Sequence, residues 1–312
     1  MTTLHLVDPE LLPLLELWPT ATLTAELLPV ARAREIPLPT PEENGTTLER
    51  RHVPGPKGAP TIELHIYHPG DAARPLGCIY HIHGGGYVMG AAKSLEAIHR
   101  NIVSQLGCAL VSVDYRLAPE TPHPGPVEDC YAGLAWLFDH AEELGVDRAR
   151  IGVMGESAGG GLAAALALLA RDRGEYRLAF QHLTYPMLDD RTCTAADPHP
   201  HAGEFVWTPA SNVFGWTALL GHEPGIDGVS PYAAAARATD LAGLPPTYIM
   251  TGALDLFVEE DIAYAQRLIR AGVPTELHVF PGAFHGFNVY PAADVTQRAQ
   301  AAQLSALRRA LA

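Results

Sequence analysis

The sequence predicts an α/β protein built on a mostly parallel sheet, and two observations carry this prediction. Strand-like runs alternate with helix-like segments from about residue 45 onward, which is typical of β–α units and parallel sheets. One of these strands leads through a glycine-flanked serine, at residues 155–159, directly into a helix-like segment. The chain of 312 residues is 47% apolar and 18% charged, a composition typical of globular proteins.

The first 45 residues are predicted to form helical segments interrupted by proline. Asp8 followed by Pro9 is typical of a helix N-terminus, where an aspartate caps the helix and proline fits its first position. Leucines and a tryptophan within residues 11–18 supply an apolar face. We expect a second helix to start within residues 22–24 and to end near residues 34–41.

Seven later runs have the apolar content of strands. They span residues 61–69, 75–82, 107–115, 150–155, 178–185, 246–252 and 275–282. Helix-like segments are predicted between them and after the last, at residues 92–106, 126–144, 157–172, 260–272 and from about 292 to the end. Functional sites of such sheets lie at the carboxyl ends of the strands.

Residues 186–230 interrupt the alternation and contain a predicted helix around residues 208–221. We interpret this stretch as an insertion that lies over the sheet. No internal repeat and no shift in composition marks a linker between independent domains. The sequence therefore predicts one composite domain.

The segment GESAG, residues 155–159, matches the G-x-S-x-G pattern of a nucleophile elbow. The motif requires a strand before it and a helix after it, and both are predicted here. Ser157 would stand on a strained turn with its hydroxyl exposed above the sheet, while the glycines keep neighbouring side chains away. The alternative is a tight strand–helix turn with a chance serine, which the context makes the weaker interpretation.

A serine hydroxyl needs a general base, and His285 is the candidate. It follows the last predicted strand in the glycine-flanked segment FPGAFHGF. His81 and His83 also lie near a strand end, but they come too early for the chain order serine, acid, histidine. We expect His83 to brace its own loop and not to act as the base.

The base in turn needs an acid that fixes its tautomer and stabilises the imidazolium. Asp255 follows the strand-like run that ends at residue 252, and it precedes His285 in the expected order. Asp240 precedes that strand, whereas Glu259 and Asp261 fall in the following helix. The sequence therefore favours Asp255 over these three acids.

Three consecutive glycines follow the strand-like run at residues 75–82. Glycine is costly to order, so a run of them needs a reason, and close approach of the backbone to a reacting group is one. An acyl-transfer site stabilises an oxyanion with backbone N–H groups. We expect the amides of this glycine loop, together with that of Ala158 behind the serine, to form such an oxyanion hole.

Charge and cysteine usage exclude several classes of function. The formal net charge is −14 and no basic run occurs, so nucleic acid and anionic membranes are poor partners. The longest uncharged stretch near a helix, residues 157–170, is too short to span a bilayer, and the N-terminus lacks the features of a signal peptide. The four cysteines show no metal-like spacing and suit a reducing, cytoplasmic compartment.

Five segments together resemble a known family. They are HGGGY at 83–87, VDYRLAPE at 113–120, GESAGGGLA at 155–163, GALD at 252–255 and FHGF at 284–287. In combination they resemble the hormone-sensitive-lipase-like α/β-hydrolases, the bacterial family IV esterase branch. The resemblance implies an eight-stranded, mostly parallel sheet flanked by helices. It also implies a helical cap from residues 1–45 and 186–230 over a catalytic core of residues 46–185 and 231–312.

Carried over residue by residue, the family's triad falls on Ser157, Asp255 and His285. Its oxyanion hole falls on Gly84, Gly85 and Gly86, foremost the last two, together with Ala158. Two residues depart from the family pattern: Leu256 replaces a common proline after the acid, and Glu156 replaces a common aspartate before the serine. Neither position is expected to take part in the chemistry directly. The YRLAPE segment is expected to be structural, with its arginine and its glutamate ion-paired or hydrogen-bonded.

The function implied is a serine carboxylesterase that hydrolyses small, uncharged esters of short acyl chain without a cofactor or metal. Two alternatives remain open: an amide or formamide hydrolase on the same triad, and a small-ligand receptor that has lost catalysis. Family analogy also implies a homodimer. Candidate lining residues of the substrate pocket, each with plain core packing as the alternative, are Leu14, Leu15, Trp18, Trp207, Phe214 and Trp216.

Overall fold

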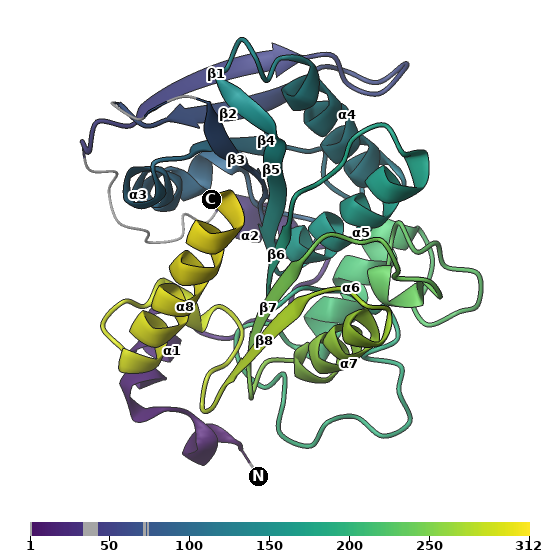
Figure 1. Ribbon diagram of the computed structural model, residues 1–312. Helices are drawn as coiled ribbons and strands as arrows, with labels where there is room; N and C mark the ends of the chain where they lie inside the picture. The colour runs from purple at the N-terminus through teal and green to yellow at the C-terminus, as the bar shows by residue number, and fades with distance from the viewer. Residues whose placement is uncertain (1, 34–42, 71–72, 74) are drawn as a thin grey trace.

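The computed structural model describes residues 2–33, 43–70, 73 and 75–312 (Figure 1). Its centre is an eight-stranded sheet in the order β1-β2-β4-β3-β5-β6-β7-β8. The strands are β1 Thr47–Val53, β2 Ile62–His68, β3 Leu76–Ile82, β4 Ala109–Asp114, β5 Val146–Glu156, β6 Gln181–Thr184, β7 Thr247–Gly252 and β8 Thr275–Phe280. Only β2 runs in the direction opposite to the other seven strands, so the sheet is mostly parallel, as predicted.

The pattern of apolar residues predicted seven of these strands and missed β1. In β1, Val53 alone is buried, and the strand carries Glu49, Arg50 and Arg51. A strand at the edge of a sheet has a neighbour on one side only and needs little apolar surface. Its sequence therefore lacks the alternation by which the other strands were predicted.

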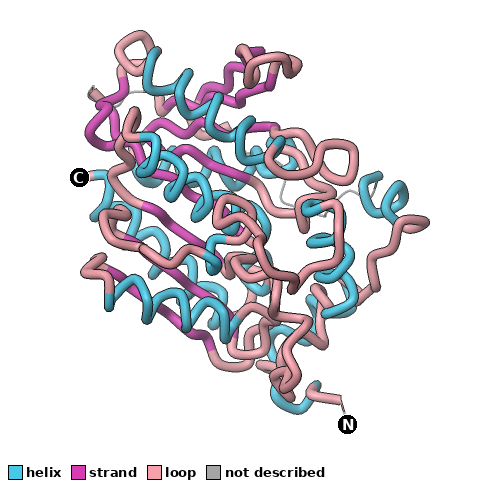
Figure 2. The backbone as a smooth tube through the Cα atoms, turned by 90° about the vertical axis from the view of Figure 1, so that its right-hand side faces the viewer, coloured by secondary structure: helices cyan, strands magenta, loops and turns pink. Residues whose placement is uncertain are grey.

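Helices cover both faces of the sheet. Figure 1 shows α3 and α8 on one side and α4, α5 and α7 on the other, and Figure 2 shows the strands side by side in one twisted layer. Three separate clusters of buried side chains hold these layers together. The helices are α1 Leu12–Leu17, α2 Leu28–Ala33, α3 Glu96–Leu106, α4 Gly125–Asp139, α5 Ala158–Arg173, α6 Pro209–Leu220, α7 Val258–Arg270 and α8 Asp294–Leu311.

Helix α5 lies in the middle of the molecule and is buried on every side from Ala158 to Ala170. It packs against β5 and β6 and against α4. Its sequence consists of glycine, alanine and leucine over this stretch, because small side chains let a helix approach a sheet and a second helix at the same time. The residue before this helix therefore has its position fixed by the densest part of the core.

The N-terminal segment begins as predicted, with Pro9 in the first turn and the Asp8 carboxylate accepting a hydrogen bond from the amide of Glu10 at 3.0 Å. The second helix, α2, starts at Leu28, later than predicted. Its predicted end near residues 34–41 lies outside the described residues.

The predicted insertion lies between β6 and β7 and contains α6. Two hydrogen bonds join the insertion to the N-terminal segment. The amide of Leu23 donates to Ser211 Oγ at 2.9 Å, and the amide of Val206 donates to Thr20 Oγ1 at 3.0 Å. Segments that are far apart in the sequence therefore lie against each other here.

Candidate active site

Ser157 occupies a sharp turn between β5 and α5. Its φ of 57° and ψ of −124° are unusual for a residue with a side chain, and such strain is held only where the surroundings enforce it. The amide of Ser157 donates to the Thr184 carbonyl at 2.9 Å, and its own carbonyl accepts from Gly161 at 3.0 Å and Met187 at 2.9 Å. The predicted strand–turn–helix context of the serine is therefore present.

Glycines around Ser157 allow backbones to approach one another closely. A Cβ atom on Gly155 would lie 2.3 Å from the Gly159 carbonyl oxygen, and one on Gly159 would lie 2.1 Å from the Ile82 carbonyl oxygen. No real Cβ tolerates such distances. These glycines therefore let β5, the turn and the end of β3 pack at contact distance.

Ser157, His285 and Asp255 are joined by two hydrogen bonds. His285 Nε2 lies 2.9 Å from Ser157 Oγ, and His285 Nδ1 lies 2.8 Å from Asp255 Oδ2. An ionised carboxylate only accepts, so Nδ1–H donates to Asp255 and the free Nε2 accepts from the serine hydroxyl. The three residues follow β5, β7 and β8, at the carboxyl ends where sites of such sheets lie.

Asp255 is fully buried, and its second oxygen, Oδ1, accepts from the amide of Phe257 at 3.0 Å. Both carboxylate oxygens are therefore held in place. The three rival acids lie elsewhere: Asp240 accepts from a neighbouring amide at the surface, whereas Glu259 and Asp261 lie on α7. Of the four acids, the structure brings only Asp255 into hydrogen-bond contact with His285 among the described residues.

Aromatic rings enclose His285, and the sequence analysis did not single out two of them. The ring of Tyr185 lies 4.6 Å from that of His285, and the ring of Phe257 meets it edge-on at 5.3 Å. The Tyr185 hydroxyl also donates to Asn288 Oδ1 at 2.6 Å, just beyond the histidine in the chain. No motif marks Tyr185 or Asn288, because their role depends on a contact between distant segments.

The glycine loop after β3 adopts a conformation that requires glycine at two positions. Gly85 has φ of 121° and Gly86 has φ of 60°. A Cβ on Gly85 would lie 2.1 Å from the Met89 carbonyl oxygen, and one on Gly86 would lie 2.2 Å from the Trp207 ring. The loop therefore depends on glycine for its backbone angles and for its close contacts.

The amides of this loop differ in their partners. Gly84 N–H donates to Glu156 Oε1 at 3.4 Å, so it is already engaged. Within the described part of the chain, the amides of Gly85, Gly86 and Ala158 donate to no protein acceptor. A Cβ on Gly84 would lie 3.3 Å from Ser157 Cβ, which shows how closely this loop approaches the serine.

His83 braces this loop, in line with the role expected from the sequence. Burial lowers the pKa of His83, which favours the neutral ring. Its Nδ1–H donates to the Gly84 carbonyl at 2.8 Å, and its ring stacks on that of Tyr115 at 4.3 Å. The Tyr115 hydroxyl in turn donates to the His83 carbonyl at 2.9 Å. His83 therefore holds the backbone of the glycine loop in place and lies outside the Ser157–His285–Asp255 arrangement.

The candidate pocket residues fall into three groups. Trp207 lies against Gly86, and Trp18 lies near Gly286, beside His285. Trp216 is fully buried against Tyr87, and Leu14 is buried in an apolar cluster, which is the core packing that the sequence left open for them. Leu15 and Phe214 are partly buried at the edges of the apolar clusters.

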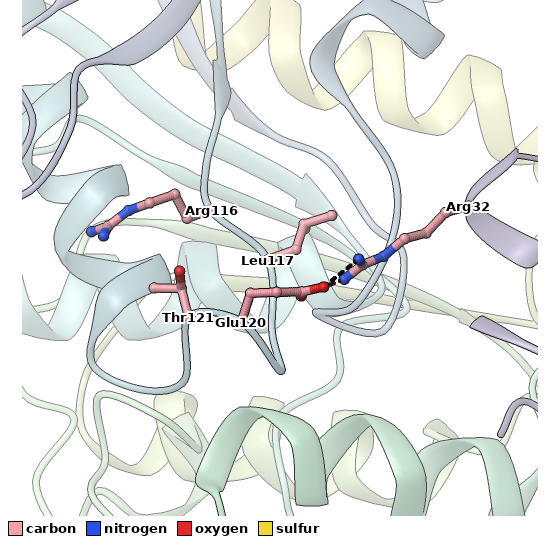
Figure 3. A pocket seen from close by; sticks show the side chains of 5 residues that line it. All are labelled: Arg32, Arg116, Leu117, Glu120 and Thr121. Atoms are coloured by element: carbon pink, nitrogen blue, oxygen red, sulfur yellow. Dashed lines mark hydrogen bonds and ion pairs between the residues drawn. The ribbon is translucent and has the colours of Figure 1, made fainter. Parts of the chain in front are cut away.

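The YRLAPE segment is ion-paired, as expected, although its two charged ends have different partners. Arg116 forms a bidentate pair with the buried carboxylate of Asp129, at 2.7 and 2.8 Å. Glu120 pairs with Arg32 of α2 at 2.7 Å (Figure 3). An open pocket of about 300 Å³ lies here, lined by Arg32, Arg116, Leu117, Glu120 and Thr121. None of the three residues joined at Ser157 lines it.

The described residues contain no cluster of three histidine, cysteine, aspartate or glutamate side chains that could hold a metal ion. Across the same part of the chain, every helix is too short or too polar to cross a membrane.

Comparisons with known proteins identify relatives over the whole chain. A family model described as alpha/beta hydrolase fold matches residues 79–289. Carboxylesterase NlhH of Mycobacterium tuberculosis is 37% identical over 317 aligned residues, covering 98% of this chain and 96% of the relative. A bacterial heroin esterase structure is 42% identical, with a TM-score of 0.93 and full coverage of both chains. Esterase LipW from Mycobacterium marinum is 34% identical, with a TM-score of 0.81 over 98% of this chain and 96% of its own.

Proposed function

Because the chain belongs to the alpha/beta hydrolases, in their hormone-sensitive-lipase-like branch, and is a carboxylic ester hydrolase, we propose that it is a serine esterase acting through Ser157, His285 and Asp255. The observation that carries the proposal is the pair of hydrogen bonds, 2.9 and 2.8 Å long, that joins these side chains in series. A serine on a strained turn, a base within reach and an acid behind the base form the arrangement that nucleophilic catalysis needs.

In the proposed reaction, Ser157 Oγ attacks the ester carbonyl while His285 Nε2 takes the hydroxyl proton. Asp255 keeps the proton on Nδ1 and stabilises the imidazolium that forms. His285 then gives its proton to the leaving alcohol, which leaves an acyl group on Ser157. Water attacks this acyl-enzyme with His285 again as base, and the acid product departs.

The oxyanion is proposed to bind the amides of Gly85, Gly86 and Ala158. These three amides have no acceptor among the described residues, whereas that of Gly84 is engaged by Glu156. Gly84 is therefore left out of the hole that the sequence predicted, and its part is to let the loop approach Ser157. Loss of one such donor raises a barrier by about 2.7–4 kcal/mol.

We assign residues 1–45 and 186–230 to a cap over the core of residues 46–185 and 231–312. The hydrogen bonds between the N-terminal segment and the insertion support this division. Trp18 and Trp207 come from these two segments and lie beside the glycines at 286 and 86. We propose that these two rings, beside the glycine loop and the residue after His285, limit the substrates to small, uncharged esters of short acyl chain.

A panel of nitrophenyl esters tests this function. The acetate and butyrate should be hydrolysed faster than the octanoate and dodecanoate, and Ser157→Ala should remove the activity on all four. A nitroanilide of acetic acid, run beside them, separates ester from amide hydrolysis, because the alternative function predicts turnover of the anilide. Full activity of Ser157→Ala would overturn the proposal, and a preference for dodecanoate would overturn the short-chain assignment.

We further propose a homodimer and a cytoplasmic location. The four cysteines are free, and three of them are buried, which suits a reducing compartment. β8 is an edge strand whose far side faces no other strand of the sheet, and such an edge can pair with a second copy. Light scattering during size-exclusion chromatography tests the dimer, and fractionation of the source cells tests the location.

A further inference from the structure

A chain of buried polar groups leads from α3 to the residue before the nucleophile. His99 on α3 is fully buried, and its Nε2 lies 3.2 Å from Nδ1 of His81 on β3. The Nε2 of His81 lies 2.9 Å from Glu156 Oε2. Glu156 Oε1 then accepts from the amide of Gly84 at 3.4 Å. The proposed reaction uses none of these side chains, although Glu156 directly precedes Ser157 in the sequence.

The chemistry of the two side chains determines which of them donates the hydrogen bond between His81 and Glu156. An ionised carboxylate only accepts hydrogen bonds, so His81 Nε2–H is the donor to Glu156. On its other side, His81 Nδ1 has the hydroxyl of Ser112 at 3.1 Å as well as His99. Burial and the neighbouring histidines lower the pKa of His99 well below its usual range. His99 is therefore neutral and carries no positive charge that would attract the Glu156 carboxylate. Glu156 therefore receives one bond from β3 and one from the glycine loop.

Without His81, the Gly84 amide, 3.4 Å away, would be the one remaining group of this set that holds the Glu156 carboxylate against the loop. The side chain is 22% exposed, so it has a route to solvent, whereas His81 is 2% exposed and held in its strand. Gly84 is the first residue of the loop that presents the Gly85 and Gly86 amides. Its backbone already lies against Glu156, because a Cβ on Gly84 would be 2.8 Å from the Glu156 carbonyl oxygen.

We propose that His81 and Glu156 form a positioning pair that fixes the glycine loop against Ser157 through the Gly84 amide. The pair touches no reacting atom. It acts on the placement of the Gly85 and Gly86 amides, and this inference rests on the proposed serine esterase function. Groups that hold transition-state donors contribute to the chemical step and not to the binding of the ester in its ground state.

The test compares three variants by steady-state kinetics on nitrophenyl butyrate. His81→Leu removes the donor and should lower kcat by about 10- to 100-fold with little change in KM, since small misplacements of catalytic groups have effects of this size. His81→Gln restores an N–H donor near the position of Nε2 and should recover most of the lost kcat. His65→Leu is the matched control, because His65 is also a buried strand histidine bound to a glutamate, Glu63, at 2.7 Å.

Binding of a transition-state analogue gives a second measurement, which would not change if His81 had only a structural role. A trifluoromethyl ketone forms a hemiketal oxyanion on serine, so His81→Leu should weaken its inhibition by the same factor as kcat/KM falls. Inhibition by the product alcohol should stay unchanged. A loss of kcat/KM that appears only in KM, or that spares the trifluoromethyl ketone, would overturn the inference.

Glu156→Ala covers the outcome in which His81→Leu does not fold, because Glu156 is partly exposed. It should reproduce the fall in kcat. Where both single variants fold, the double variant should be no slower than the slower single one, because both changes break the same link. Multiplied losses would contradict a shared role. The wild type and Ser157→Ala, assayed alongside, report on the proposed function separately: an inactive wild type defeats that function, whereas an active wild type with an unimpaired His81→Leu defeats only the positioning pair.

Discussion

Tyr185 holds the histidine of the site in two ways at once: its ring lies 4.6 Å from the ring of His285, and its hydroxyl donates to Asn288 Oδ1 at 2.6 Å. Asn288 follows His285 by three residues, so the loop that carries the base is fixed on both sides. Tyr185 itself has φ of 34°, a conformation that the surrounding structure must enforce.

Tyr185→Phe keeps the ring and removes the hydrogen bond. We expect kcat to fall by several fold and the free energy of unfolding to fall by about 1 kcal/mol, the usual net contribution of one hydrogen bond. Tyr248→Phe is the control, because the Tyr248 hydroxyl is buried without a partner in the described residues. Kinetics and urea unfolding measure both effects. An equal loss of activity in the two variants would show that the Asn288 bond has no special role.

Asp255→Asn should reduce kcat by about 10³- to 10⁴-fold while the protein stays folded. The asparagine amide can donate to His285 Nδ1, which favours the tautomer with its proton on Nε2, and that nitrogen then cannot accept from Ser157. Asp240→Asn, at the surface, should leave kcat unchanged. Nitrophenyl butyrate assays check both, and substantial activity in Asp255→Asn would point to a different acid.

Gly86→Ala should lower kcat by at least 10-fold, because misplaced donors have effects of this order. The added methyl would have to displace the Trp207 ring, 2.2 Å away, or shift the loop. Gly174→Ala is the control: Gly174 also has positive φ, 71°, but open space around its Cβ position. That change should cost about 1 kcal/mol of stability and leave kcat intact. Similar kinetics for the two variants would argue against a steric role at Gly86.

Stability should fall as the pH drops below about 6.5, the usual pKa of histidine in an unfolded chain. Burial lowers the pKa of His182 to about 3, so between these values the unfolded chain binds a proton that the folded protein excludes. This difference in proton binding lowers the free energy of unfolding at pH 5 by about 2 kcal/mol relative to pH 8. The lowered pKa values of His83 and His99 act in the same direction.

His182→Phe tests this assignment, because phenylalanine keeps the stacking on Tyr248, 4.3 Å away. Urea unfolding measures the gap between the free energies of unfolding at pH 8 and at pH 5. In His182→Phe this gap should be about 2 kcal/mol smaller than in the wild type. His52→Phe, at an exposed position, should leave the gap unchanged. A gap unaltered in His182→Phe would show that other groups govern the acid sensitivity.

Asp261→Asn should stabilise the protein at pH 8 by about 1–3 kcal/mol. Burial and the neighbouring carboxylates of Glu260 and Asp255 raise the pKa of the Asp261 carboxyl, and a contact with Thr251 offsets this only in part. A carboxyl whose pKa is raised by folding stabilises the protein most at pH values below its pKa in the unfolded chain. This stabilisation is lost as the pH rises. The gain should therefore shrink between pH 8 and pH 5. Glu259→Gln, at an exposed position of the same helix, should give no such gain.

The sequence predicted what depends on local order and missed what depends on distant contacts. The segment around Ser157 carries its own strand, turn and helix signals, so its conformation follows from neighbouring residues. The strand β1 was missed because its exposed edge needs no apolar pattern. Tyr185 and Asn288, and likewise His81 and Glu156, lie far apart in the chain, so their pairing appears only when the sheet brings them together.

Helix α5 has a consequence for how this protein can change over time. Every residue from Ala158 to Ala170 is buried, so almost any enlargement there disturbs several packed layers at once. Ser157 precedes this helix, so its position should change little as the sequence changes. The N-terminal segment and the insertion meet through a few side-chain hydrogen bonds and carry partly exposed residues, so they tolerate substitution more readily. New substrate preferences should arise in those two segments, while the reacting serine stays where the core puts it.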